Sequence, residues 1–154
     1  MQYIYQEKQI VWWLVVPFSI ILFFLILALF IATTSESAKL GLVVSIVIMV
    51  LILVNFYQLK ISVSQHYLKV AFGQGLFKKT FDVKNINPGR FSIVKLPWYY
   101  GMGWKYDFSG HMFFSTRPGQ ALSFQLKGSP MQYRIVANDN AALKAAILKA
   151  ISFG

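Results

Sequence analysis

Histidine and aspartate side chains are the first candidates for chemistry in this chain, because they supply general acids, general bases and metal ligands near neutral pH. Two histidines and three aspartates are present: His66, Asp82, Asp107, His111 and Asp139. Asp107 and His111 are four residues apart across a Ser-Gly turn, and Asp139 precedes a helical pattern that it can cap. No G-x-S-x-G, H-E-x-x-H or phosphate-loop motif occurs, and there is no cysteine. We therefore expect no catalytic residue, no metal site, no cofactor and no enzymatic activity.

Basic side chains are far more numerous and indicate binding of an anion instead. Four are candidate contacts to an anionic lipid head group or another ligand: Lys78, Lys79, Lys105 and Arg117. Lys78 and Lys79 are neighbours in an alternating pattern, so only one of them can point into any single pocket. We favour a solvated positive surface attracted nonspecifically to anionic lipid, and keep a basic pocket as the alternative. Nucleic acid is disfavoured, because no recognised binding module is present.

An aromatic, glycine-containing loop is the second candidate for binding. Residues 97–105 read PWYYGMGWK and supply four aromatic side chains: Trp98, Tyr99, Tyr100 and Trp104. Such a loop can form a platform for a partner or enter the membrane interface. It can also pack over the end of a small barrel, with its glycines at positive φ, and we favour this packing role.

These candidates must be positioned around two long apolar runs. Residues 10–32 and 40–57 contain no charge. A hydrocarbon core about 30 Å thick takes about 20 helical residues, and backbone groups inside lipid must be satisfied within the segment. Buried helices of a soluble core are the first alternative, but a chain of 154 residues is too short to cover them. A cleaved signal peptide, the second alternative, has a shorter apolar core. We predict a transmembrane hairpin.

Aromatic and basic residues mark one membrane face at the ends of these runs. Trp12 and Trp13 begin the first run, Tyr57 closes the second, and Lys8 and Lys60 flank them. Amphipathic rings and lysine stems favour the membrane–water interface. We therefore expect Trp12, Trp13, Tyr57 and Lys60 to be interface anchors.

The charge is distributed as unevenly as the hydropathy. The formal net charge is +10, from 15 Lys and Arg against 5 Asp and Glu. Two bases and two acids precede residue 58, which leaves 13 bases and 3 acids after it. Because Lys and Arg accumulate on the cytoplasmic side of spanning helices, we place both termini in the cytoplasm and the connection at residues 33–39 outside.

After residue 58 the hydrophobic period changes from helical to alternating. Seven runs read as short strands, at residues 60–64, 67–72, 76–83, 90–96, 111–116, 121–126 and 131–136. Turn signals cluster between them, notably NINPG at residues 85–89. An amphipathic helix follows over residues 140–151, with Asp139 as its cap. We predict a mainly β (α+β) domain of roughly seven antiparallel strands in a small open barrel or sandwich, capped by this one helix.

Three short stretches add a family resemblance: GMGWK at residues 101–105, ALSFQLKG at residues 121–128 and YRIVAND at residues 133–139. They look like the glycine-rich stretch, the penultimate strand and the last strand of a pleckstrin-homology-like (PH-like) domain. With the hairpin in front, the chain resembles bacterial membrane proteins that carry such a domain behind two transmembrane helices. The resemblance implies a PH-like fold over about residues 59–151, a fold used for lipid, peptide and protein binding. It also implies a bacterial plasma (inner) membrane location.

These inferences divide the chain into a hairpin at residues 1–58 and a cytoplasmic PH-like domain at residues 59–154. The favoured function is a membrane-anchored, non-enzymatic interaction or scaffold module. Its basic face would lie against anionic lipid, while a sheet edge or the aromatic loop meets an unknown membrane or cytoplasmic protein. One alternative is a sensor of lipid head groups that uses a basic pocket. The alternative of another class is an enzyme or an accessory subunit of a membrane transport complex.

Overall fold

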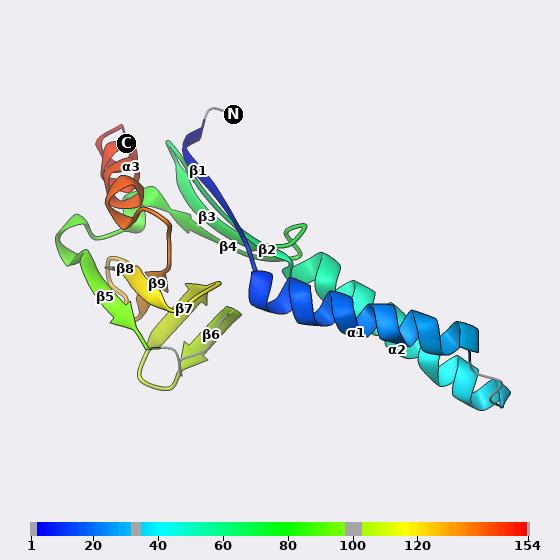
Figure 1. Cartoon of the computed structure of the whole chain (residues 1–154). Coiled ribbons are helices and arrows are strands. Elements are labelled where there is room, and N and C mark those ends of the chain that lie inside the picture. The colour runs from blue at the N-terminus through cyan, green and yellow to red at the C-terminus, as the bar shows by residue number, and fades with distance from the viewer. Residues whose placement is uncertain (1–2, 32–34, 98–102, 154) are drawn as a thin grey trace.

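The computed structural model describes residues 3–31, 35–97 and 103–153. Figure 1 shows two parts, a hairpin of two long helices and a β region made of two sheets and a C-terminal helix. A strand that precedes the hairpin and all strands that follow it belong to the β region. The chain therefore leaves the β region through one helix and returns to it through the other.

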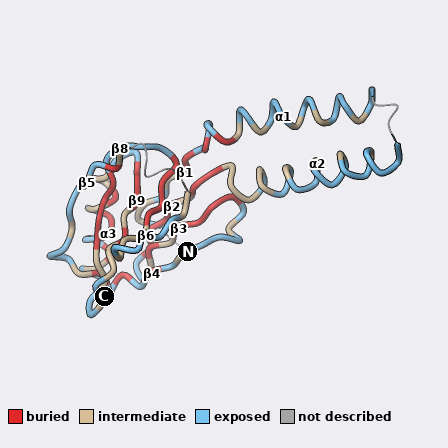
Figure 2. Tube along the Cα trace, turned by 90° about the horizontal axis from the view of Figure 1, so that it is seen from below, coloured by how far each residue is buried: buried red, intermediate tan, exposed pale blue. Residues whose placement is uncertain are grey.

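The hairpin consists of α1 (Trp12–Ile31) and α2 (Glu36–Phe56), which run antiparallel and contact each other. Of the residues described in these helices, Leu14 alone is buried, and Figure 2 shows exposed residues along both. Apolar side chains that stay exposed over most of two helices favour an apolar environment around them. Both helices are long and apolar enough to cross a membrane, by length and composition.

The expected spans at residues 10–32 and 40–57 are confirmed as helices with shifted ends. The largest shift is at the start of α2, which includes Glu36 and Lys39. Their side chains pair at 3.3 Å, one turn apart. Such a pair stabilises an exposed helical turn only slightly. It lies in the first turn of α2, and the rest of the helix is mainly apolar.

The first sheet has four strands in the order β1-β2-β3-β4, and every neighbouring pair is antiparallel. Their bounds are Tyr3–Ile10, Gln58–Ser64, Tyr67–Phe72 and Phe77–Asp82. Two 3-10 turns at Val83–Asn85 and Pro88–Arg90 then lead to the second sheet. They form where the sequence predicts turns.

The second sheet has five strands in the order β5-β8-β9-β7-β6. Their bounds, in chain order from β5 to β9, are Ser92–Leu96, Gly103–Asp107, His111–Ser115, Gly119–Gln125 and Gln132–Ile135. β7 and β9 are parallel, and the other pairs are antiparallel. The chain places β9 between β8 and β7, which is why one parallel pair arises in a sheet of short connections.

Both sheets contribute to one shared core, which takes buried residues from β2, β3, β4, β7, β8, β9 and the C-terminal helix. The Phe81 ring lies near its centre, in edge contact with Phe114, Phe124 and Tyr133 at 6.2, 5.3 and 4.6 Å between ring centroids. Edge-to-face contacts of this kind add specificity to apolar burial. The two sheets are thereby held as one unit.

The C-terminal helix α3 (Asn140–Ser152) covers this core as the sequence predicts. Its buried residues are Leu143, Ala146, Ile147 and Ala150, which recur at three- and four-residue steps. The Asp139 carboxylate accepts a hydrogen bond from the Ala142 N–H at 2.9 Å. The cap is therefore confirmed, and Asp139 has a structural task.

Two strands were not predicted, so the described residues contain nine strands instead of the expected seven or so. β1 reads YIYQEKQI, whose polar residues hide its alternation, and β6 begins inside the stretch assigned to an aromatic loop. The division at residue 58 also needs correction, because β1 precedes the hairpin yet forms the edge of the first sheet. Pairing with β2, rather than local sequence, makes this segment a strand.

Candidate functional site

The helices join the β region through one pair of adjacent strands. β1 passes into α1 at Val11, and α2 passes into β2 at Tyr57. The Val11 N–H donates to the Tyr57 carbonyl at 2.9 Å, and Val11 is buried. The pairing of β1 with β2 therefore continues into the base of the hairpin.

A second connection fixes the base of the hairpin to the second sheet. Trp13 Nε1–H donates to the Thr116 carbonyl, between β7 and β8, at 2.9 Å. The Gln9 side chain donates to the Val136 carbonyl at 2.8 Å and accepts from the Thr116 hydroxyl. Gln9 and Thr116 are only 6% and 4% exposed. Loss of either partner would leave a buried polar group unsatisfied, so this connection is specific.

A third connection lies between the β3–β4 turn and the end of α2. Gly73 has φ +53°, and its N–H donates to the Gln58 carbonyl at 2.7 Å. A Cβ atom on Gly73 would lie 2.2 Å from the Asn55 carbonyl oxygen. Phe56 stacks on Phe77 beside it, with 4.9 Å between ring centroids. The close backbone approach at residue 73 therefore requires glycine.

The outward face of the first sheet carries four lysines, which we call the lysine face: Lys8, Lys60, Lys69 and Lys78. Lys8, Lys60 and Lys78 fall in one cross-strand row, and Lys69 falls in the next row away from the hairpin. Alternate residues of a strand share a side, so all four project away from the core. Among the described residues, Asp82 is the one carboxylate in register with this face, at the end of β4 remote from the hairpin.

The four basic residues predicted as ligand contacts are not gathered into one site. Lys78 belongs to the lysine face, whereas Lys79 pairs with the buried Val70 and points to the other side of the sheet. Lys105 lies in β6, in the second sheet. Arg117 lies in the β7–β8 connection, near the base of the hairpin. The strand alternation that separates Lys78 from Lys79 follows the sequence-based expectation.

Arg117 lines a cavity of about 560 Å³ together with Lys8, Trp12, Trp13 and Asn138. The Arg117 guanidinium donates to Asn138 Oδ1 at 2.6 Å, which orients it. We call this space the basal cavity. Sequence reasoning did not predict that Lys8 and Arg117 line the same cavity, because the two residues are far apart in the chain.

The expected interface anchors lie together at the base of the hairpin. Trp12 is 63% exposed and Trp13 is 44% exposed, although the indole N–H of Trp13 is bound within the protein. Tyr57 and Lys60 are half-buried at the end of α2 and in β2. Their contact with lipid stays a prediction.

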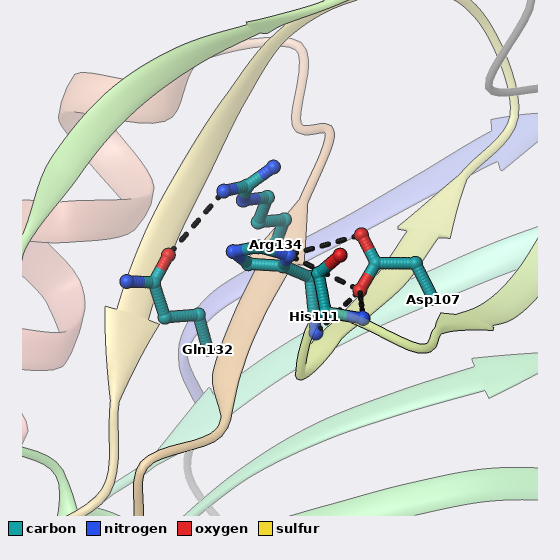
Figure 3. A network of polar contacts seen from close by, with 5 residues as sticks. Asp107, His111, Gln132 and Arg134 are labelled. Carbon is teal, nitrogen blue, oxygen red and sulfur yellow. Dashed lines mark hydrogen bonds and ion pairs between the residues drawn. The ribbon is translucent and has the colours of Figure 1, made fainter.

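Asp107 and His111 form a close pair in the β6–β7 turn, with 2.9 Å between Asp107 Oδ2 and His111 Nδ1 (Figure 3). Asp107 Oδ1 also accepts from the backbone N–H groups of Ser109 and His111 at 3.0 and 2.8 Å. Burial raises the Asp107 pKa, but the hydrogen bonds from His111, its charge and the Ser109 N–H together lower that pKa below the usual value. This carboxylate closes a turn, which accounts for the pair without catalysis.

Gln132 and Arg134 of β9 form a second polar contact beside this pair (Figure 3). Arg134 donates to Gln132 Oε1 at 3.3 Å, and its guanidinium lies 5.3 Å from the Phe113 ring centroid. The buried Arg134 Nε has no hydrogen-bond partner within the described part of the chain. In that same part, no three His, Asp or Glu side chains gather closely enough to hold a metal ion.

The aromatic loop is described at its C-terminal end only. Trp104 packs on Phe114, with 5.4 Å between ring centroids, and lies against the shared core. This contact agrees with a packing role for Trp104. Trp98, Tyr99 and Tyr100 lie outside the described residues. Sequence reasoning missed two neighbouring aromatic residues, Tyr106 and Phe108, which are 52% and 102% exposed.

Comparison of the chain with known proteins gives no relative from which a function can be transferred: no protein-family model, no curated protein and no solved structure matches it.

Proposed function

We propose that this chain is a membrane-anchored, non-enzymatic interaction module of the bacterial plasma (inner) membrane. Its two apolar helices span the bilayer, and its β region is a PH-like domain held against the cytoplasmic surface. The observation that carries this proposal is the lysine face, which begins directly beside the base of the hairpin. Anionic lipid attracts each lysine near its surface by about 1 kcal/mol.

The orientation follows from charge. All but two of the 15 basic residues lie in the chain after residue 57, whereas the hairpin connection has Lys39 alone. Such asymmetry favours a cytoplasmic β region and cytoplasmic termini. A reporter fused after Gly154 tests this. Activity of a cytoplasm-specific reporter is expected, and activity of a periplasm-specific reporter would overturn the orientation and the lipid argument together.

The PH-like assignment is supported by two sheets that share a core closed by one C-terminal helix. The end of β6 favours a protein partner. Tyr106 of β6 and Phe108 after it are exposed. Exposed aromatic rings are enriched at surfaces that bind other proteins.

Lipid apposition is measurable with single cysteines, because the chain has none of its own. Thr80→Cys places a fluorescent label on the lysine face, opposite Lys69, and Ser92→Cys places one on an exposed position of β5 as a matched control. The full chain is reconstituted in nanodiscs that contain a head-group quencher, with or without phosphatidylglycerol. We expect phosphatidylglycerol to increase quenching at residue 80 and not at residue 92, and added salt to reverse the increase. Equal quenching in both lipid compositions would reject the proposal.

A further inference from the structure

We infer that the base of the hairpin holds a binding site for a single anionic phospholipid, with the phosphate in the basal cavity and an acyl chain in an adjoining apolar groove. This inference rests on the proposed membrane insertion of the hairpin. It differs from the lysine face in kind, because a surface attracts many lipids weakly and a built site retains one.

The basal cavity supplies the cationic half of this site. Lys8 of β1 and Arg117 of the β7–β8 connection are both among the residues that line it. A guanidinium has five N–H donors, and the hydrogen bond to Asn138 Oδ1 uses one of them. The fork of remaining donors suits a phosphate, which Arg binds in a bidentate way. The cavity volume of about 560 Å³ is within the usual range for small-ligand sites.

The nearest carboxylate is already compensated by donors inside the protein. Glu7 accepts from the Asn138 N–H at 2.8 Å, from Gln9 Nε2 at 2.7 Å and from the Tyr5 hydroxyl. Glu7 alternates with Lys8 along β1, so the two side chains leave opposite sides of the strand. None of the described residues that line the basal cavity is acidic. The described lining of the basal cavity therefore includes two cationic residues and no carboxylate.

An apolar groove of about 480 Å³ supplies the other half. Val15 of α1 and Leu53 and Val54 of α2 line it. Ile10 and Trp12 line both this groove and the basal cavity, so the two spaces adjoin. An acyl chain that follows the groove would run along the helices, in the direction of the hydrocarbon core.

The two halves together identify the ligand class. A soluble phosphate ester would use the cations and leave the groove uncovered, whereas a neutral lipid would use the groove and leave the cations unpaired. A phospholipid with a net negative head group carries both chemistries in one molecule, and Trp12, which lines both spaces, is expected to meet the interface.

Native mass spectrometry of the full chain released from detergent tests this site. Phosphatidylglycerol, phosphatidylcholine and free glycerol phosphate are added in turn. We expect one tightly retained phosphatidylglycerol, weaker retention of phosphatidylcholine, and no competition by glycerol phosphate. Arg117→Gln and the exposed variant Lys8→Gln are each expected to weaken phosphatidylglycerol binding about tenfold, since each removes a charge-assisted contact. Lys127→Gln, in an exposed turn, is the charge-matched control and should bind as the parent does.

A variant of the apolar groove distinguishes binding of an intact lipid from binding of its head group alone. Val15→Trp fills the groove and leaves both cations in place, so it should reduce retention of phosphatidylglycerol. Equal retention by the parent and by both cation variants would overturn the site, and full competition by glycerol phosphate would assign it to a soluble ester instead. The quenching experiment at residue 80 reports the lysine face independently. Composition-independent quenching together with loss of lipid in Arg117→Gln would reject the proposed surface and keep the site.

Discussion

The outward faces of the two sheets differ in whether their charged side chains have partners within the protein. On the first sheet, Lys8, Lys60, Lys69 and Lys78 stand in neighbouring rows without a carboxylate between them. On the second sheet, the acid Asp107 pairs with His111, and the basic residue Arg134 donates a hydrogen bond to Gln132. Charges that are paired within the protein stabilise its turns and strands, whereas like charges left together attract an external counter-ion.

The two sheets also differ in how they are connected to the hairpin. The first sheet continues directly into both helices, and the segments beside the second sheet's strands contact α1 through Trp13 and β1 through Gln9. The unpaired positive face is therefore the one fixed closest to the helices. Four variants, one of them a triple substitution, test this contrast.

The largest expected effect is that of Gly73→Ala, which separates the first sheet from α2. The added Cβ would lie 2.2 Å from a backbone oxygen of Asn55, at a positive φ of +53°. We expect destabilisation by about 3 kcal/mol, read as a lower midpoint of thermal unfolding in detergent. Gly75→Ala is the control, because its φ of +96° carries backbone strain but nothing lies within 4 Å. That variant should lose only about 1 kcal/mol, and equal losses would contradict the role of the contact.

The second effect concerns the lysine face. Replacing Lys60, Lys69 and Lys78 together by Gln should remove about 1 kcal/mol of attraction to anionic lipid per residue. The readout is the quenching of a label at residue 80 in nanodiscs that contain phosphatidylglycerol. A triple variant at Lys127, Lys144 and Lys149 lowers the net charge equally and should retain the quenching. A matching loss in both variants would mean that net charge alone acts, without a specialised face.

The third effect concerns the link to the second sheet. Gln9→Ala leaves the buried Thr116 hydroxyl and the Val136 carbonyl without their partner. We expect a loss of about 2 kcal/mol in the free energy of unfolding. Gln6→Ala, on the same strand but exposed, should change it by less than about 0.5 kcal/mol. Indistinguishable midpoints for the two variants would show that the Gln9 hydrogen bonds add nothing.

The smallest effect is a pH dependence confined to the second sheet. The Asp107 pKa lies below its ordinary value of 3.8 in the folded chain, so the unfolded state binds the proton more readily. The stabilisation from Asp107 is therefore complete above about pH 4 and declines as the pH falls through the lowered pKa. Thermal midpoints of the parent and Asp107→Asn, measured from pH 6 downward, should differ at pH 6 and converge in acid. A constant difference would exclude this carboxylate as the titrating group.

Local patterns predicted the parts of the fold that local forces decide. The alternation over Tyr67–Phe72 matches β3 at both ends, and the cap at Asp139 with its apolar stripe matches α3. In both elements the apolar residues of one face are buried and most residues of the other face are more accessible, which is the condition under which periodicity is informative. The strands β1 and β6 lack that regularity.

The candidate site depended on tertiary contacts that no short window contains. Nothing in the sequence around Lys8 or Arg117 distinguishes them from other surface cations. They line one cavity because β1 forms the edge of the first sheet and lies near the β7–β8 connection. The sequence did indicate Arg117 as a ligand contact and Trp12 as an interface residue. The sequence could not show that Arg117, and not Lys79, lies at the cavity, because that depends on which connections between strands lie near the hairpin.

The pairing of β1 with β2 has a consequence for biogenesis. The two strands are neighbours in the sheet, yet both helices are synthesised between them. During translation β1 therefore lacks this partner until β2 has emerged from the ribosome. In the proposed membrane arrangement, the strand pair can form only when the β1 end of α1 and the β2 end of α2 lie on the same side of the bilayer. A chain that inserted one helix alone could not complete the edge of the first sheet.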